Sequence, residues 1–328
     1  MNIIEAVEVR KQYRDKVALD NVSMNIPQGA IFGLLGPNGA GKTTFIRILT
    51  QITAPDSGYV LMSGQKLNRK DVDKIGYLPE ERGLYKKMKV GEQALYLAQL
   101  KGLDARTAKA EITKWFDKFE ITSWWNKKVE ELSKGMAQKV QFIATVVHKP
   151  KLLIFDEPFS GFDPINVNLL KSEILNLKNQ GATIIFSTHN MTSVEEICDE
   201  IALIDHAKIV LSGKVSALKR QFAGDMYSFE LELPGDRNQS VIDEMQNKLM
   251  DVIVEDNILK GRISANCLGN ISGCVREDET SGNTAKTTNY MVQYLMQAGN
   301  LINFNEILPS MNDIFIQTVT KAENTKNE

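Results

Sequence analysis

The chain has 328 residues, of which 43% are hydrophobic and 24% are charged. This composition is ordinary for a folded globular protein and excludes a disordered, collagenous or disulfide-scaffold chain. At about 150 residues per domain, the length suggests about two domains. The three cysteines, Cys198, Cys267 and Cys274, are too few for a disulfide framework, and an odd number is typical of a reducing compartment.

No segment has the character of a membrane-inserting element. The first residues lack the apolar core of a secretory signal. The longest uncharged run, residues 287–305, holds several Asn, Gln and Thr side chains and is too polar to span a bilayer. We therefore expect that any work at a membrane needs a partner that supplies the membrane spans.

Charge is distributed unevenly along the chain. Residues 224–328 contain 8 basic and 16 acidic side chains, whereas residues 1–223 contain 31 basic and 25 acidic ones. This shift in composition predicts a domain boundary between the two segments. Because a phosphate backbone binds clustered Lys and Arg, the acidic C-terminal part argues against nucleic acid as a partner.

Residues 1–223 show strands that alternate with helices. The polar–apolar alternation over residues 3–26 predicts two or three antiparallel strands. Short apolar runs predict buried strands at residues 30–35, 75–78, 152–155 and 183–186, and a last strand pair at 201–204 and 209–211. Helical spacing of apolar residues predicts helices over 42–51, 91–149 and 165–179. The alternation predicts an α/β core with a mostly parallel sheet.

The C-terminal part predicts a small α+β domain. Residues 226–254 read as strand, Pro-Gly-Asp turn, helix and strand, and residues 289–321 as helix, strand and helix. The glycine- and serine-rich segment 269–288 is predicted to be a loop. Cys267 and Cys274 have neither a CxxC pair nor a nearby histidine, so we expect no metal site there.

A phosphate-binding loop follows the buried strand at residues 30–35. The residues Gly36, Pro37, Asn38, Gly39, Ala40, Gly41, Lys42 and Thr43 match GxxxxGK[ST] and precede Thr44 at the start of a helix. Glycines let the backbone wrap around phosphate oxygens, and the helix N-terminus attracts their charge. Lys42 would reach the β- and γ-phosphates, and Thr43 would offer its hydroxyl to Mg²⁺. The alternative, a chance glycine-rich turn, is disfavoured by the flanking elements.

Two carboxylates end the apolar strand at residues 152–155. Asp156 can hold the Mg²⁺ shell, and Glu157 can orient or deprotonate an attacking water. A strand that ends in Asp-Glu could be a mere turn, but its pairing with the phosphate-binding loop favours nucleotide hydrolysis.

Further motifs resemble those of ATP-binding-cassette (ABC) ATPases. Leu132-Ser133-Lys134-Gly135-Met136 resembles the LSGGQ signature and begins shortly before the strand that carries Asp156. Residues 160–163 resemble the D-loop of the family, His189 stands where the family has its switch histidine, and Tyr13 stands where it has an adenine-stacking aromatic. The resemblance covers about residues 1–220.

The resemblance implies roles for these residues. Tyr13 would stack on adenine, although it could also be an ordinary half-buried strand tyrosine. His189 would bind the γ-phosphate or the water and steady Glu157. Ser133 would cap a helix whose N-terminus, with Gly135, faces the nucleotide of the opposite subunit. This arrangement implies a head-to-tail dimer with a second copy or a related cassette.

Two departures from the family pattern stand out. In the signature, Lys134 replaces the first glycine and Met136 replaces the glutamine. In the segment that resembles the Q-loop, Glu80 stands where glutamine is usual; it can still offer an oxygen to Mg²⁺, but it adds negative charge and cannot donate a hydrogen bond unless protonated. We expect catalytic roles for Glu157, His189 and Glu80, and metal binding by Thr43, Asp156 and Glu80.

The helical subdomain is expected at about residues 88–149. In the family this subdomain borders the groove for the permease's coupling helix. Five aromatic side chains before the signature either form an exposed hot spot for that helix or belong to the subdomain core: Trp115, Phe116, Phe119, Trp124 and Trp125.

The resemblance implies a P-loop ABC ATPase core, with a mostly parallel sheet, an antiparallel subdomain and a helical subdomain, followed by a small α+β C-terminal domain. The expected function is the hydrolysis of ATP with Mg²⁺ to drive a separate membrane permease. The protein would lie in the cytoplasm, on the inner face of the plasma membrane. The tail from Ile307 resembles single-cassette subunits of ABC-2-type exporters, including a group linked to sodium export.

Two rival interpretations remain. The first is a soluble ABC ATPase that acts on nucleic acid or ribosomes; such proteins usually carry two cassettes or a long coiled coil, and this chain has neither. The second is a binding module with an inactive site, which the presence of Lys42, Asp156, Glu157 and His189 disfavours.

Overall fold

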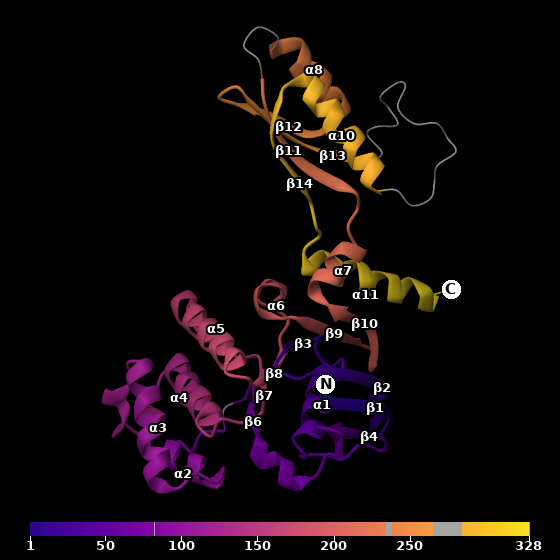
Figure 1. Cartoon of the computed structure of the whole chain (residues 1–328). Helices are drawn as coiled ribbons and strands as arrows, with labels where there is room; N and C mark the ends of the chain where they lie inside the picture. The colour runs from indigo at the N-terminus through magenta and orange to yellow at the C-terminus, as the bar shows by residue number, and fades with distance from the viewer. Residues whose placement is uncertain (82, 234–237, 265–283, 328) are drawn as a thin grey trace. The chain divides into compact units, whose positions relative to one another are not determined.

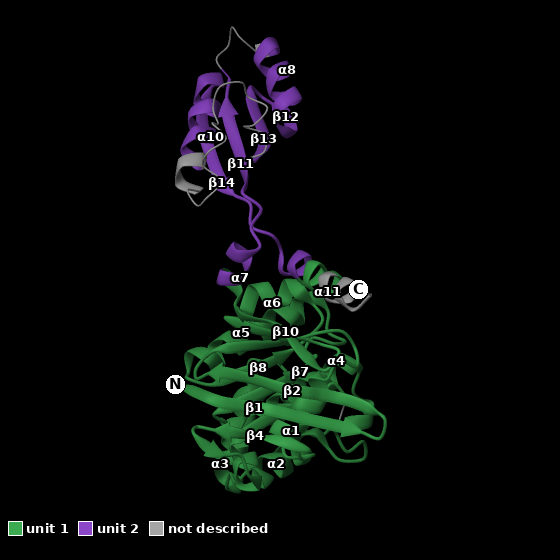
Figure 2. Ribbon diagram, turned by 90° about the vertical axis from the view of Figure 1, so that its right-hand side faces the viewer, with its two compact units in different colours: residues 1–216, 315–328 green, residues 217–314 purple. Residues whose placement is uncertain are grey.

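The computed structural model describes residues 1–81, 83–233, 238–264 and 284–327 (Figure 1). The chain divides into two compact units, residues 1–216 with 315–328, and residues 217–314 (Figure 2). This division lies a few residues before the boundary expected from charge, and it assigns the end of the chain to the first unit. Charge composition marks a change in surface chemistry, whereas compact units are set by packing.

The first unit is built on a mostly parallel sheet. Its strands are β3 (Ile31–Leu35), β6 (Ile75–Leu78), β7 (Leu152–Asp156), β8 (Thr183–Ser187), β9 (Glu200–Asp205) and β10 (Lys208–Lys214), in the order β10-β9-β3-β8-β7-β6. All ladders are parallel except the edge pair β9–β10. Every residue of β3, β7 and β8 is buried, as expected for a parallel sheet that is covered on both faces. The carboxyl ends of β3, β7 and β8 therefore meet at one edge, where ligands bind in such folds.

A second, antiparallel sheet belongs to the same unit. Its order is β2-β1-β4-β5, from β1 (Asn2–Tyr13), β2 (Lys16–Pro27), β4 (Ser57–Met62) and β5 (Gln65–Lys66). Residues 3–26 thus supply two strands, and the third comes from β4, which the sequence analysis missed because half of β4 is exposed and shows no alternation. One apolar core joins this sheet to the parallel sheet through side chains such as Ile4, Leu19, Phe45 and Ile154.

The helices of the first unit begin at well-defined caps. They are α1 (Lys42–Leu49), α2 (Val90–Leu100), α3 (Ala105–Lys118), α4 (Lys134–Val146), α5 (Pro164–Asn179), α6 (Met191–Ile197) and α7 (Val215–Gln221), with short 3₁₀ turns at Arg69–Lys74, Thr122–Trp124 and Val129–Glu131. Asp104, Ser133 and Asp163 accept backbone N–H groups as N-caps of α3, α4 and α5. The predicted helical region 91–149 is therefore three helices, α2, α3 and α4, which pack against one another. The predicted fold class is confirmed.

The aromatic residues before the signature form the core of this helical region. Phe116 is fully buried and Phe119 is 2% exposed. The Trp115 ring lies 6.0 Å from that of Phe142, which in turn lies 5.5 Å from Phe155 on β7. Neither Trp124 nor Trp125 is exposed. Phe116 and Phe119 therefore belong to the core, whereas Trp115, Trp124 and Trp125 are half-buried, so the five rings as a group are not an exposed hot spot.

Within its described residues, the second unit has a four-stranded antiparallel sheet, with one helix after the first strand and another before the last. Its described elements are β11 (Met226–Glu232), α8 (Asn238–Lys248), β12 (Met250–Glu255), β13 (Ile258–Ser264), α10 (Thr284–Ala298) and β14 (Asn300–Glu306), and the last helix, α11 (Met311–Asn327), follows. The sheet order β12-β13-β11-β14 is the β-α-β-β-α-β arrangement of ferredoxin-like domains. Its core includes Phe229, Leu231, Leu259, Met291 and Leu295.

Some expectations for this region differ from the structure or fall outside it. Strand β13 is not predicted from the sequence pattern. The predicted Pro-Gly-Asp turn, Cys267 and Cys274 lie outside the described residues, as does most of the predicted loop 269–288. Residues 284–288, the last part of the predicted loop, instead form the first turn of α10. Within the described part of the chain, no helix is long and apolar enough to cross a membrane.

Candidate active site

The phosphate-binding loop depends on glycine at two tight points. Gly36 has φ +143°, and a Cβ there would lie 2.1 Å from the carbonyl oxygen of Ile204. Gly41 has φ +124°, and a Cβ there would lie 2.3 Å from the carbonyl oxygen of Ala18. Any side chain at either position would therefore displace backbone, which fixes glycine in the loop between β3 and α1.

A cavity of about 360 Å³ opens beside this loop. It is lined by Tyr13, Lys16, Ala18, Asn38, Gly39, Gly41, Lys42, Thr43, Thr44, Arg47, Glu80, Asp156, Glu157 and His189. Residues from distant motifs thus surround one space. Of the residues expected at the site, Gly36, Pro37, Ala40, Ser133 and Gly135 do not line it.

Lys16 and Arg47 line this cavity although the sequence analysis did not select them. Arg47 stands four residues after Thr43, on the same face of α1, and this helical spacing could have identified it. Lys16 opens the strand that follows Tyr13. Neither belongs to a recognisable motif. Both add positive charge to a cavity that would hold phosphates.

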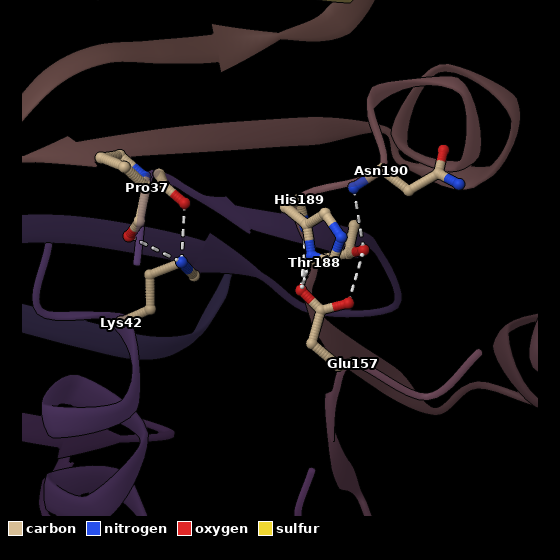
Figure 3. A network of polar contacts seen from close by, with 7 residues as sticks. Pro37, Lys42, Glu157, Thr188, His189 and Asn190 are labelled. Carbon is tan, nitrogen blue, oxygen red and sulfur yellow. Dashed lines mark hydrogen bonds and ion pairs between the residues drawn. The ribbon is translucent and has the colours of Figure 1, made fainter. Parts of the chain in front are cut away.

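The Lys42 ammonium is held by the loop itself. Its Nζ donates hydrogen bonds to the carbonyl oxygens of Gly36, at 2.6 Å, and Pro37, at 3.1 Å (Figure 3). Burial lowers the pKa of Lys42, while the nearby carboxylates of Glu157, Asp156 and Glu80 act in the opposite direction. Lys42 therefore lies in the cavity beside three acidic groups.

Asp156 ends β7 and is only 4% exposed. Burial raises its pKa, and the charges of Glu80 and Glu157 raise it further. Burial and the charge of Asp156 also raise the pKa of Tyr77 to about 12. The interior end of the cavity thus concentrates negative charge that a divalent cation would neutralise. Among the described residues, however, no cluster of three or more His, Cys, Asp or Glu side chains could hold a metal ion by itself.

Glu157 is hydrogen-bonded through both carboxylate oxygens (Figure 3). The backbone N–H of His189 donates to its Oε1 at 2.9 Å, and His189 Nδ1 lies 2.8 Å from the same oxygen. The hydroxyl of Thr188 donates to Oε2 at 3.1 Å. Since Glu157 follows β7 and His189 follows β8, the pairing of these two strands brings the groups together.

Tyr13 lies at the end of β1 and lines the cavity with 42% of its surface exposed. The Nζ of Lys11 lies 5.5 Å from the centre of its ring. An exposed ring at the mouth of this cavity has a face available for a flat base.

Ser133 and Gly135 lie at the start of α4, away from the cavity lining. Ser133 Oγ accepts the backbone N–H of Met136 at 3.3 Å. A Cβ at Gly135 would lie 3.3 Å from the carbonyl oxygen of Gly161, so the signature segment packs closely against the loop before α5.

A second cavity, of about 290 Å³, lies among β6, α2 and α4. Its lining is mostly apolar and comprises Gly76, Tyr77, Pro79, Gly83, Leu84, Leu97, Leu100, Lys101, Gln141, Ala144, Thr145 and His148. Gln141 Oε1 and both ring nitrogens of His148 are buried in this cavity wall. Burial, and then the charge of Lys101, lower the pKa of His148 to about 4. The imidazole is therefore neutral near pH 7.

Comparison with known proteins agrees with this geometry. The family model described as ABC transporter matches residues 19–160. An uncharacterized ABC transporter ATP-binding protein of Bacillus subtilis, YhaQ, is 50% identical over 214 residues, which cover 65% of this chain and 72% of YhaQ. An uncharacterized ABC transporter ATP-binding protein of Alkalihalophilus pseudofirmus is 36% identical over 295 residues. The aligned residues cover 88% of this chain and 99% of that protein.

Solved structures show the same fold. The structure of an ATP binding subunit of an ABC transporter superposes with a TM-score of 0.63 at 28% sequence identity. The superposed residues cover 67% of this chain and 93% of that subunit. The dimeric structure of the cassette MJ0796 superposes with a TM-score of 0.60 at 21% identity, covering 65% of this chain and 98% of that one. With the phosphate-binding loop, the carboxylate pair and the histidine around one cavity, these likenesses identify the chain as a member of the ABC transporter family, an ATP-binding subunit that hydrolyses ATP.

Proposed function

We propose that this chain is the ATPase subunit of an exporter, and that it drives a separate membrane permease through ATP-dependent dimerisation. The observation that carries the proposal is the first cavity, where Lys42, Asp156, Glu157 and His189 from three separate segments surround one space. The proposed direction of transport is an inference that the names of two relatives support. They include a lantibiotic transport ATP-binding protein of Streptococcus pyogenes at 34% identity and a linearmycin resistance ATP-binding protein of Bacillus subtilis at 32% identity.

In this proposal the cavity binds ATP through its phosphates and its base. The adenine stacks on Tyr13, and the backbone N–H groups of Asn38, Gly39 and Gly41 face the phosphates. Lys42 exchanges the carbonyls of its own loop for the β- and γ-phosphate oxygens. This exchange is favourable because a buried ammonium gains more from an anion than from neutral carbonyls.

The acidic end of the cavity fits Mg²⁺. The Thr43 hydroxyl and the carboxylates of Asp156 and Glu80 are the hard oxygen ligands that Mg²⁺ prefers, and all three residues line the cavity. Mg²⁺ usually completes its shell with substrate phosphates. Bound there, the ion would neutralise charge on the phosphates.

Glu157 is the group that orients and deprotonates the attacking water. It follows the strand that ends in Asp156, and its carboxylate is fixed by hydrogen bonds at both oxygens. The His189 ring contacts Glu157 through Nδ1, and it would turn to the γ-phosphate when the nucleotide binds. Catalysis then rests on positioning and on stabilisation of charge, as in other phosphoryl transfers.

A second subunit would complete the site. Ser133 and Gly135 do not line the cavity of their own chain, but they lie at the N-terminus of α4, where backbone N–H groups favour an anion. We assign them to the nucleotide of an opposing copy, or of a related cassette, in a head-to-tail dimer.

The second cavity is the proposed contact with the permease. Its apolar lining and the exposed side chains Tyr85, Tyr96 and Leu100 suit an amphipathic helix that lays an apolar face into a groove. This partner would place the chain in the cytoplasm, on the inner face of the plasma membrane. We propose this cavity as the hot spot in place of the aromatic cluster, in which Phe116 and Phe119 are buried and the three tryptophans are half-buried.

The test is purification of the tagged full-length chain from membranes of its native host, with ATPase activity measured on the product. We expect a multi-span membrane protein to co-purify, and we expect Leu100→Glu to release it. Ile52→Glu is the matched control, because Ile52 is 64% exposed in the same unit but lies outside both cavities. Co-purification of ribosomes or nucleic acid in place of a membrane protein would overturn the proposal.

A further inference from the structure

The hydroxyl of Thr188 connects the turn before α6 to the carboxylate of Glu157. Thr188 lies between β8 and α6 and is 2% exposed. Its Oγ1 accepts the backbone N–H of Asn190 at 3.1 Å and lies 3.1 Å from Glu157 Oε2 (Figure 3). No motif in the sequence draws attention to this side chain, because the histidine beside it carries the family resemblance.

The direction of these two hydrogen bonds is fixed. A backbone N–H can only donate, so Asn190 uses a lone pair of Thr188 Oγ1. An ionised carboxylate can only accept, so the hydroxyl proton of Thr188 points at Glu157 Oε2. The threonine is therefore oriented as a donor toward the acid by its own backbone turn.

Thr188 and His189 hold opposite oxygens of the same carboxylate. His189 supplies its backbone N–H and its ring to Oε1, whereas Thr188 alone among the described residues supplies a side-chain donor to Oε2. When the imidazole turns to a phosphate, the ring contact with Oε1 is lost. The Thr188 hydroxyl and the His189 backbone N–H then remain, one donor for each oxygen, and together they fix the plane of the carboxylate.

We propose that Thr188 is a positioning residue for Glu157, and that it keeps Oε2 in place so that Oε1 faces the attacking water while His189 engages the nucleotide. This inference rests on the proposed role of Glu157 as the base. A donor that is already aligned needs no rearrangement during the reaction, and misplacement of a catalytic group by about 1 Å can cost up to about 10²-fold in rate.

The competing explanation is a purely structural hydroxyl that only satisfies the N–H of Asn190. Kinetic measurements distinguish the two explanations. A structural defect would lower stability and nucleotide binding, whereas a positioning defect would lower kcat alone. Replacement of Glu157 also distinguishes the two explanations. If Thr188 acts only through Glu157, the loss of the Thr188 hydroxyl should have no further effect on the rate once Glu157 is replaced.

The test uses the full-length chain with Thr188→Val, which keeps the shape and removes the hydroxyl, and Thr188→Ser, which keeps the hydroxyl. Thr183→Val is the matched control, because Thr183 is fully buried on the adjoining strand and its Oγ1 accepts only the remote backbone N–H of Gly29 among the described contacts. We expect Thr188→Val to lower kcat about tenfold with KM for ATP within about twofold of wild type, the scale of one hydrogen bond to a charged group. Thr188→Ser and the control should keep the wild-type kcat.

A double mutant completes the experiment. In the Glu157→Gln background, single-turnover rates with and without Thr188→Val should be equal. An unchanged kcat in Thr188→Val, a failure of serine to restore it, or an equal loss in the Glu157→Gln background would each overturn the inference. If valine prevents folding, Thr188→Ala takes its place in the same comparison with serine. Normal turnover of Glu157→Gln alone would instead contradict the assigned base, so the two failures are distinct.

Discussion

His189 and Glu157 form a hydrogen-bonded pair in which Nδ1 lies 2.8 Å from Oε1. Since an ionised carboxylate only accepts, Nδ1 carries the proton of this hydrogen bond, and Nε2 takes no part in it. The His189 side chain is 77% exposed, whereas that of Glu157 is 16% exposed. The pair thus joins a sheltered acid to a ring that is free to turn toward a ligand.

Replacement of Glu157 by glutamine should separate binding from hydrolysis. An amide keeps the size of the side chain, but its single oxygen can receive the donors of only one side, Thr188 or His189, and it cannot take a proton. We expect ATP affinity to persist and turnover to fall by roughly 10²-fold or more, the scale of a lost general base. Phosphate release measures the turnover.

The same variant should accumulate an ATP-bound dimer, because closure precedes hydrolysis in the proposed cycle. Size-exclusion chromatography with ATP detects it. The matched control is Glu130→Gln, an exposed acid outside the cavity. Near-normal phosphate release by Glu157→Gln would remove this residue from its assigned role.

Complementation tests the shared site. If Lys42 and Ser133 act on one nucleotide from different subunits, a heterodimer of Lys42→Ala with Ser133→Ala has one doubly damaged site and one intact site. We expect its ATPase activity to exceed that of either parent homodimer. A heterodimer of verified composition that is no more active than the parents would contradict the head-to-tail arrangement.

Acid should destabilise the protein through His148. Its folded pKa is lowered to about 4, so below pH 6.5 the unfolded chain takes up a proton that the folded chain does not. The contribution of neutral His148 to stability is thus fully present above pH 6.5 and is lost as the pH falls toward 4. We expect His148→Gln to flatten the fall in Tm between pH 7 and 5. Parallel Tm curves for variant and wild type would show that the imidazole titrates normally.

Strong local signals in the sequence located the nucleotide motifs and most of the parallel sheet. The strands β3, β7 and β8 are uniformly buried, so each reads as an apolar run, and the glycines of the loop are dictated by close backbone contacts at Gly36 and Gly41. These features depend on short stretches of chain, which is why the pattern alone predicts them.

Features that depend on tertiary packing were not predicted from the sequence. The strand β4 lies largely exposed against β1 and lacks alternation, and β13 follows β12 after a two-residue turn. Lys16 reaches the cavity only because the fold brings its strand to the phosphate-binding loop, whereas Arg47 lies four residues after Thr43 on α1 and its helical spacing was overlooked. The aromatic residues around Trp115 could not be sorted into core or surface from spacing, since both uses of an aromatic side chain have the same pattern.

Glu80 is the residue where this chain departs most clearly from its family, and charge balance predicts its effect. It lines the cavity, and its charge acts on Lys42, Asp156 and Tyr77. A carboxylate there attracts Mg²⁺ but repels the triphosphate. At ~4 Å and an effective dielectric of ~20, one such charge pair is worth ~4 kcal/mol before water screens it, so the two effects are of similar size and opposite sign.

Their dependence on the metal differs, and this difference supplies the test. Without Mg²⁺ only the repulsion acts, so Glu80→Gln should bind ATP more tightly than wild type. With Mg²⁺ the variant should gain less from the ion, because it has lost one anionic ligand. ATP titrations with and without Mg²⁺ on both proteins measure the two effects. Glu81→Gln is the control, since Glu81 is exposed beside Glu80 but does not line the cavity. Identical curves for Glu80→Gln and wild type would place Glu80 outside the metal site, and its carboxylate would then serve only the surface near the second cavity.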